Sequence, residues 1–235
     1  MIPKKIFFVC FLFILTSCAE LQNVVNTLPG QTGPDPLMIA NGLRQALDFG
    51  IDKQVSKLTQ KDGFYKNPLV KILLPPELQK VDKTLRDIGL SSLADEGLKV
   101  LNRAAEDAVK EATPIFVNAV REITFTDAKN ILLGPDNAAT SYLEMKTNSQ
   151  LYARFNPVIQ NSFSKVGADQ IWNNIITRYN SVPFVNKVNP DLTDYVTNEA
   201  LDGVYKMIAV EEKKIRTKVA SRTTTLLKQV FALQD

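Results

Sequence analysis

Apolar residues recur at intervals of three and four nearly everywhere from residue 38 onward, and this spacing constrains the fold more than any other feature. Such intervals place apolar side chains along one face of an α-helix, whereas a half-buried strand alternates apolar and polar residues. One stripe comprises Leu43, Leu47, Ile51, Val55 and Leu58, and a second comprises Leu78, Val81, Leu85 and Ile88. No regular series of short strands interrupts the pattern. We therefore expect an all-α domain over residues 38–235.

Residues that favour helix ends divide this domain into about eight or nine helices. Helix starts are indicated at Ser91 or Ser92, Thr113-Pro114, Thr126-Asp127, Asp136 or Asn137, Asp191, and Thr223 or a neighbour, and helix ends at Gly89 and Gly134-Pro135. Pro157 predicts a break or kink within one long helix. Residues 69–74 could form one short strand, but no partner strand is evident. We expect a single bundle with mixed crossing angles and no significant sheet.

The N-terminal residues are typical of an export signal. Lys4 and Lys5 precede an apolar run over residues 6–15, and small residues then lead to Cys18. This run is too short to span a bilayer as a helix, which takes about 20 residues, and the order of its regions is that of a secretory signal peptide. A cysteine directly after small residues resembles the bacterial lipobox. We therefore predict a signal peptide over residues 1–17, acylation of Cys18 and a lipid anchor in a membrane.

The residues that follow Cys18 predict a tether. Residues 18–37 contain three prolines and two glycines and show no apolar period, so we expect a flexible link between the lipid and the helical domain. Ala19, rather than an aspartate, is compatible with export to the outer membrane. The predicted location is the cell envelope, with the domain facing the periplasm.

Composition excludes several classes of chemistry. The chain has no histidine, which removes Ser-His-Asp catalysis and histidine-based zinc sites. Its two cysteines are Cys10, which leaves with the signal, and Cys18, so no free thiolate remains; we expect no metal site and no cofactor. The net charge falls from +3 to +1 when Lys4 and Lys5 are removed. A nearly neutral domain has no field that would attract nucleic acid.

Polar residues beside a stripe of small ones are the candidates for ligand binding. Asn102, Arg103 and Glu106 are interspersed with Ala104, Ala105 and Ala108, where helices are expected to approach closely. A guanidinium in such a place must be paired or must line a polar cavity, because burying it alone is prohibitive. One interpretation is a structural salt bridge with an acidic neighbour. The other is a cleft in which Arg103, Lys71 and Lys146 together bind an anionic or carboxylated ligand.

Three other motifs are interpreted structurally. Ser162 and Lys165 have the Ser-x-x-Lys spacing of penicillin-binding enzymes, but the partner motifs and the sheet of that fold are missing. Residues 189–194 place oxygen atoms as a calcium loop does, but Asp194 replaces the required glycine and Ala200 the required glutamate, so helix capping explains them better. Glu212 and Arg216 form an i,i+4 pair, which favours a solvent-exposed helix face for residues 211–216 over a face that docks a partner.

Several short motifs in the same order resemble a bacterial family, domain of unknown function 4197, over roughly residues 38–231. The motifs are Asp62-Gly63-Phe64, Asn67-Pro68-Leu69-Val70-Lys71-Ile72, Leu101-Asn102-Arg103-Ala104-Ala105-Glu106, Thr126-Asp127-Ala128, Asp194-Tyr195-Val196-Thr197, Ala200-Leu201-Asp202-Gly203, Glu211-Glu212-Lys213-Lys214-Ile215-Arg216 and Arg222-Thr223-Thr224. The resemblance implies an exported, often lipid-anchored, mostly helical protein. It implies no activity, so no catalytic residue follows from it.

Three functional hypotheses remain open at this point. The leading one is a non-enzymatic lipoprotein whose helical domain binds a protein partner or a small ligand. The second is a hydrolase that uses carboxylates alone, which requires two acidic side chains to converge in a deep pocket. The third is a carrier of hydrophobic molecules, which requires a large apolar cavity.

Overall fold

The computed structural model describes residues 35–76, 79–184 and 186–234. Pro36–Asp235 is one compact unit. The predicted signal peptide, Cys18 and nearly all of the predicted tether lie outside the described residues. The last two tether residues, 36 and 37, belong instead to the first described helix, which begins at Pro36 because proline suits the first turn of a helix.

The described residues fold into helices with no strand, which confirms the predicted all-α class. The elements are α2 (Pro36–Leu58), α3 (Gln79–Asp87), α4 (Ser91–Val109), α5 (Ala112–Arg121), α6 (Phe125–Leu132), α7 (Ala138–Ser164), α8 (Ala168–Asn180), α9 (Leu192–Thr217), the 3-10 helix η2 (Val219–Ser221) and α10 (Thr225–Phe231). No described helix is both long and apolar enough to cross a membrane.

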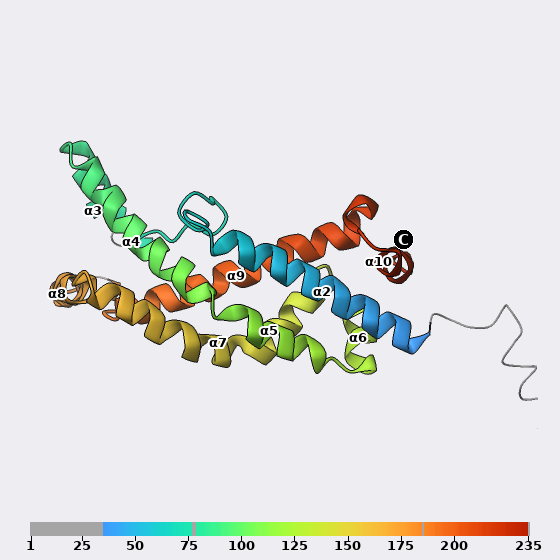
Figure 1. Cartoon of the computed structure of the whole chain (residues 1–235). Helices are drawn as coiled ribbons and strands as arrows, with labels where there is room; N and C mark the ends of the chain where they lie inside the picture. Colours follow the sequence, from blue (N-terminus) through green and yellow to red (C-terminus); the bar gives the residue numbers. More distant parts are fainter. Residues whose placement is uncertain (1–34, 77–78, 185, 235) are drawn as a thin grey trace, which may run out of the picture. The chain divides into compact units, whose positions relative to one another are not determined.

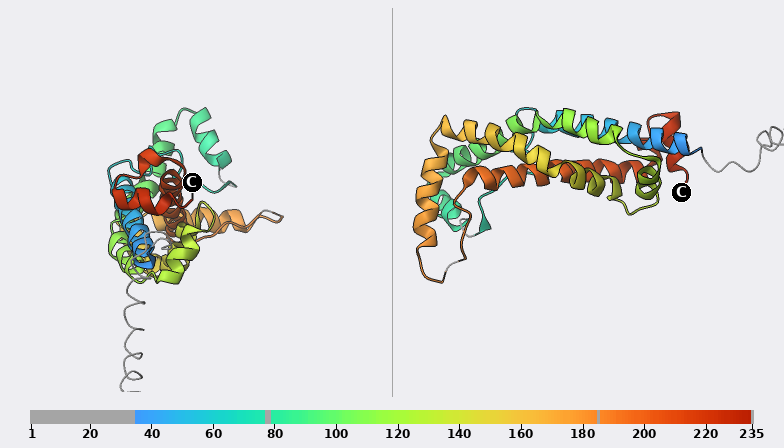
Figure 2. Two further views of the ribbon diagram at one scale, coloured as in Figure 1. Left: turned by 90° about the vertical axis from the view of Figure 1, so that its right-hand side faces the viewer. Right: turned by 90° about the horizontal axis from the view of Figure 1, so that it is seen from below.

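Helix α9 is the centre of the packing, since it contacts α2, α4 and α7 along its length. Helix α5 packs against α2 and α7, and α6 packs against the same two helices. Within the unit, α6 and α10 lie towards one end, while α3 and α8 lie towards the other (Figures 1 and 2). Helix α3 packs on α4, and α8 packs on α7 and α9, so this second end is built from the ends of long helices and two short ones.

Most helix ends lie within a few residues of their predicted positions. Asp191 caps α9 as predicted, because its carboxylate accepts the backbone N–H of Asp194 at 3.0 Å. Helix α6 begins slightly earlier than predicted, since Thr124 forms a capping box with Asp127. The break considered at Pro157 is absent, and α7 continues through it to Ser164. A proline removes one backbone hydrogen bond, and the packing of α7 against α9, α4 and α5 compensates for that loss.

The core is one continuous apolar cluster that extends from α2 to α10. Its largest fully buried side chains include Phe64, Phe116, Phe155 and Phe163. Phe116 meets Tyr205 of α9 edge-to-face, with ring centroids 6.0 Å apart, which is a favourable aromatic geometry. The bundle is therefore stabilised by packing between helices, as expected of a domain without disulfide bonds.

Candidate functional site

Asn102 attaches an extended segment, residues 71–75, to α4. Its side chain is fully buried and makes two hydrogen bonds to Ile72: Nδ2 donates to the carbonyl at 2.9 Å, and Oδ1 accepts the N–H at 2.8 Å. Nδ2 also donates to the carbonyl of Leu98 at 2.7 Å. The side-chain amide of Asn102 thus makes the two hydrogen bonds to Ile72 that the backbone of a neighbouring strand would make. For this reason residues 69–74 need no partner strand, and they pair with no strand among the described residues.

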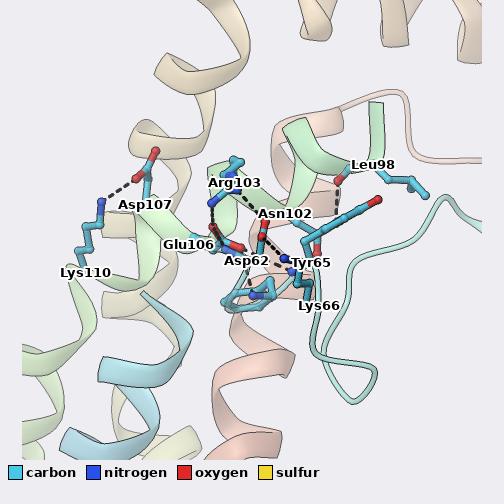
Figure 3. A network of polar contacts seen from close by, with 10 residues as sticks. Asp62, Tyr65, Lys66, Leu98, Asn102, Arg103, Glu106, Asp107 and Lys110 are labelled. Atoms are coloured by element: carbon cyan, nitrogen blue, oxygen red, sulfur yellow. Dashed lines mark hydrogen bonds and ion pairs between the residues drawn. The ribbon is translucent and has the colours of Figure 1, made fainter. Parts of the chain in front are cut away.

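Glu106 holds the preceding turn against the same helix. Its carboxylate is buried and accepts the backbone N–H groups of Asp62 at 3.3 Å and Phe64 at 3.1 Å. Arg103 bridges the turn and the helix, since it donates to Glu106 at 2.9 Å and to Asp62 at 2.6 Å (Figure 3). Of the two interpretations of Arg103, the structure shows the salt bridge.

Asp62 is held in its charged form by this network. A hydrogen bond from Lys66, whose Nζ lies 2.9 Å away, lowers the pKa of Asp62, and the positive charges of Lys66 and Arg103 lower it further. A carboxyl whose pKa is lowered by folding stabilises the folded state when ionised. This contribution is fully present above about pH 4 and is lost as the pH falls through the folded-state pKa. The network therefore opposes unfolding at neutral pH.

The predicted cationic cleft does not form around Arg103. The ammonium of Lys71 lies 4.2 Å from the ring centroid of Tyr65, and Lys146 lies 5.7 Å from that of Tyr142 on α7. Both distances are those of cation–π contacts. Lys71 therefore remains near the turn that Arg103 supports, whereas Lys146 contacts residues of its own helix. Neither lysine lines the cavity described below, and neither does Arg103, Asn102 or Glu106.

The predicted solvent-exposed face at residues 211–216 is confirmed for Lys213 and Lys214 but is wrong for the i,i+4 pair. Glu211, Glu212 and Arg216 are all buried. The i,i+4 pair is present, with Arg216 donating to Glu212 at 2.8–2.9 Å, but it lies between helices. Glu212 accepts the first N–H groups of α7 at Ala139 and Thr140, and Arg216 donates to the last carbonyls of α6. The pair thus satisfies the free backbone groups of two helix ends.

An apolar cavity of about 450 Å³ lies between α3, α4, α8 and the start of α9. Its volume is within the range of small-molecule sites, which is about 300–1,000 Å³. Large apolar side chains line it, including Leu93, Leu98, Leu101, Val166, Ile171 and Trp172. Leu93, Val166 and Ile171 are each more than half exposed, so the cavity opens to solvent through an apolar rim. The structure therefore contains an open, mainly apolar cavity at this end of the domain.

Asp82 is the one charged residue among the described residues that line this cavity. It also lines a smaller cavity of about 300 Å³, together with Leu73, Leu74, Gln79 and Leu98. Since the two cavities share Leu74, Asp82 and Leu98, they are adjacent and Asp82 stands between them. Arg86 pairs with Asp82 through two hydrogen bonds of 2.9 and 3.1 Å, and with Asp95 at 2.8 Å.

Acidic side chains are few in the described lining of the cavity. A carboxylate hydrolase needs a second acidic side chain facing the same pocket, and the described lining of the cavity supplies only Asp82. No group of three potential metal ligands occurs among the residues that the structure describes. The cavity itself is a feature that the sequence did not predict, since its lining comes from four separate elements. The sequence shows Leu93, Val166 and Ile171 as apolar residues, and only the structure shows that they are exposed at the cavity rim.

Ser162 and Asn189 belong to ordinary helix ends. Ser162 is in the last turn of α7, and Lys165 is the residue that follows this helix. Asn189 donates to Asp194 next to the cap of α9. Both motifs therefore have the structural roles assigned to them from the sequence.

Comparisons with known proteins agree with this architecture. Neither the curated proteins nor the solved structures include one that matches the chain. One family model does match, over residues 35–232, which includes every described helix. This range agrees with the resemblance noted in the sequence. The chain therefore belongs to the family described as "Protein of unknown function (DUF4197)".

Proposed function

We propose that this protein is an exported lipoprotein of the cell envelope whose helical domain binds an apolar ligand in the cavity between α3, α4, α8 and α9. The observation that carries the proposal is a cavity of about 450 Å³ with one charged residue among the described residues of its lining. The export signal and Cys18 support the location. Of the three functional hypotheses, ligand binding and carriage of a hydrophobic molecule agree with this cavity.

The chemistry of the lining favours an alkyl or acyl chain as the apolar part of the ligand. The cavity walls are leucine, isoleucine, valine and alanine side chains with one indole. Burying a methylene group from water contributes about 0.8 kcal/mol, which is about a fourfold increase in affinity. We expect affinity to rise by about this factor for each added methylene until the cavity is filled, and then to stop rising.

Trp172 provides the measurement. It is the single tryptophan of the chain and lines the cavity, with its Nε1 donating to the carbonyl of Asn189 at 3.2 Å. We would titrate the chain carrying Cys18→Ser, which cannot be acylated at that position, with dodecanol that carries bromine in its alkyl chain. Bromine quenches indole fluorescence only at short range, so the quenching reports on this cavity. Saturable quenching is the expected result, and its absence would contradict the proposal.

A pair of variants on α4 tests whether the ligand occupies this cavity. Gly97 lines the cavity, and a Cβ added there meets no atom within 4 Å. Gly97→Leu should fill the space and weaken binding by about tenfold or more, without loss of helix stability. Glu96→Leu adds the same side chain at the preceding, exposed position outside the cavity and should leave binding unchanged. Equal effects of the two substitutions would place the ligand elsewhere.

The predicted location has its own test. Mass spectrometry of the protein extracted from its native membrane should show a chain that begins at Cys18 with acyl groups attached. An intact Met1, or an unmodified Cys18, would overturn the location while leaving the cavity proposal in place.

A further inference from the structure

We infer that the ligand of this cavity carries a cationic or hydrogen-bond-donating head group, such as an ammonium or a hydroxyl, and not a carboxylate or a phosphate. This inference rests on the proposed function, because it concerns the polar end of a ligand whose apolar chain occupies the larger cavity. It is carried by the position of Asp82 between the two cavities and by the charge balance around that residue.

The two adjacent cavities differ in their polar groups. The larger one is lined by apolar side chains apart from Asp82, whereas the smaller one adds Gln79 to Asp82. A chain in the larger cavity therefore places its head beside the carboxylate of Asp82 and the amide of Gln79. An ionised carboxylate accepts hydrogen bonds and donates none. A head group that donates is therefore the one that Asp82 can bind, and the amide of Gln79, which both donates and accepts, can bind the same head group.

The ion-pair cluster described at this position, Asp82, Arg86 and Asp95, carries a net negative charge. Arg86 is the cation that pairs with Asp82, and it also pairs with Asp95 across the gap between α3 and α4. Hydrogen bonds to these two carboxylates raise the pKa of Arg86 above its usual value, so the guanidinium stays charged. The single positive charge of Arg86 thus faces two carboxylates, and its N–H groups already donate to Asp82 and Asp95. An anionic head would meet repulsion here and would find Arg86 occupied.

No other charged side chain is among the described residues that line either cavity. Besides Asp82, the described residues that line them are apolar side chains, Gly97 and Gln79. At separations near 4 Å, attraction and repulsion between unit charges each change affinity severalfold even in water. We therefore expect an ammonium head to bind about tenfold or more tightly than a carboxylate head on the same chain.

The experiment compares three probes with one chain length: dodecylammonium, dodecanol and dodecanoate at neutral pH. Each displaces the brominated dodecanol, and Trp172 fluorescence reports the displacement from the full chain carrying Cys18→Ser. The ratio of the ammonium affinity to the carboxylate affinity measures the preference. We expect a ratio of about ten or more at low salt and a smaller ratio at high salt, because salt screens partly exposed charges.

Two substitutions should move this ratio in opposite directions. Asp82→Asn removes one negative charge and should bring the ratio close to one, whereas Arg86→Gln removes the positive charge and should increase it. Dodecanol has no charge and should still bind both variants with no more than a severalfold change, which shows that the cavity is intact. Asp107→Asn, at an exposed position on α4 paired with Lys110, is the control and should leave the ratio unchanged.

The possible failures are distinguishable. If none of the three probes changes Trp172 fluorescence, the proposed function itself fails. If dodecanol binds but the ammonium and carboxylate probes bind equally, or the carboxylate binds best, only the inference about the head group is overturned. If Asp82→Asn and Arg86→Gln both lose dodecanol binding, these residues hold α3 in place. This result would also overturn the inference about the head group.

Discussion

The turn after α2 makes a different demand on each of three consecutive residues, Asp62, Gly63 and Phe64. Asp62 has a φ of 69°, and its carboxylate accepts hydrogen bonds from Arg103 and Lys66. Phe64 is fully buried and contacts α9 at Gly203, where a Cβ would lie 2.8 Å from the phenylalanine ring. Gly63 passes so close to the end of α2 that its neighbours there are backbone atoms. The motif is therefore explained by packing and not by chemistry on a ligand.

Gly63→Ala should destabilise the domain by about 2 kcal/mol or more. A Cβ at this position would lie 2.4 Å from the carbonyl oxygen of Leu58 and 2.6 Å from that of Lys57, and backbone atoms cannot move aside as a side chain can. Urea unfolding would measure the change. Gly97→Ala, where a Cβ meets nothing, is the control and should stabilise helix α4 by about 0.5–1 kcal/mol. Equal stability of the two variants would contradict the close approach.

Glu106→Gln should cost about 2–3 kcal/mol, because a buried carboxylate that accepts backbone N–H groups and pairs with Arg103 is replaced by a neutral amide. The adjacent substitution Asp107→Asn breaks an exposed pair with Lys110 and should cost less than about 1 kcal/mol. Denaturant unfolding of both variants gives the comparison. Similar losses in the two would show that Glu106 contributes no more than a surface charge.

Helix α9 joins neighbouring helices through its charged residues as well as its apolar ones. Glu212 and Arg216 connect the end of α6 to the start of α7, and Glu211 accepts hydrogen bonds from Lys53 and Gln54 of α2. The i,i+4 pattern alone indicated a solvated face, since the same spacing occurs on exposed helices. The residues that bury it lie 72–85 positions earlier in the chain, so no local pattern could show it.

Glu212→Gln should destabilise the domain by about 3 kcal/mol or more, because it leaves the buried guanidinium of Arg216 without its charged partner. Asp136→Asn is the control, since its pair with Lys213 is exposed and spans 3.7 Å, and it should change stability by less than about 1 kcal/mol. Thermal or urea unfolding would measure both. A cost for Glu212→Gln as small as that of the control would show that the buried pair does not hold α6 and α7 together.

The domain as a whole contains its own core. Every residue of the apolar cluster lies between Ile39 and Phe231, inside the unit Pro36–Asp235. The cavity is placed at the end where α3 and α8 pack on α4 and α9, away from α6 and α10 (Figure 1). Short helices that contact few neighbours leave apolar side chains of the longer ones partly uncovered, and this is how the site arises.

A fragment that comprises residues 36–235 should fold without the preceding residues. We expect a helical circular dichroism spectrum and one cooperative unfolding transition, with a midpoint equal to that of the full chain carrying Cys18→Ser. The comparison uses the same urea titration for both proteins. A fragment that is helical but unfolds without cooperativity would show that residues before Pro36 contribute to the core.

Local patterns sufficed for the all-α class and the cap of α9, because helix periodicity and capping depend on residues a few positions apart. The sequence made Asn102 and Glu106 candidates for ligand binding, whereas the structure buries both as hydrogen-bond partners of backbone groups. Three features depend on the packing of elements far apart in the chain. They are the pairing of Arg103 with Asp62, the burial of Glu212 and Arg216, and the cavity beside Trp172. Asp62 lies 41 residues before Arg103, and the cavity wall draws on α3, α4, α8 and α9. Contacts of this kind are set by the geometry of the packed helices. The spacing of apolar residues along one helix does not indicate which neighbouring helix will cover them.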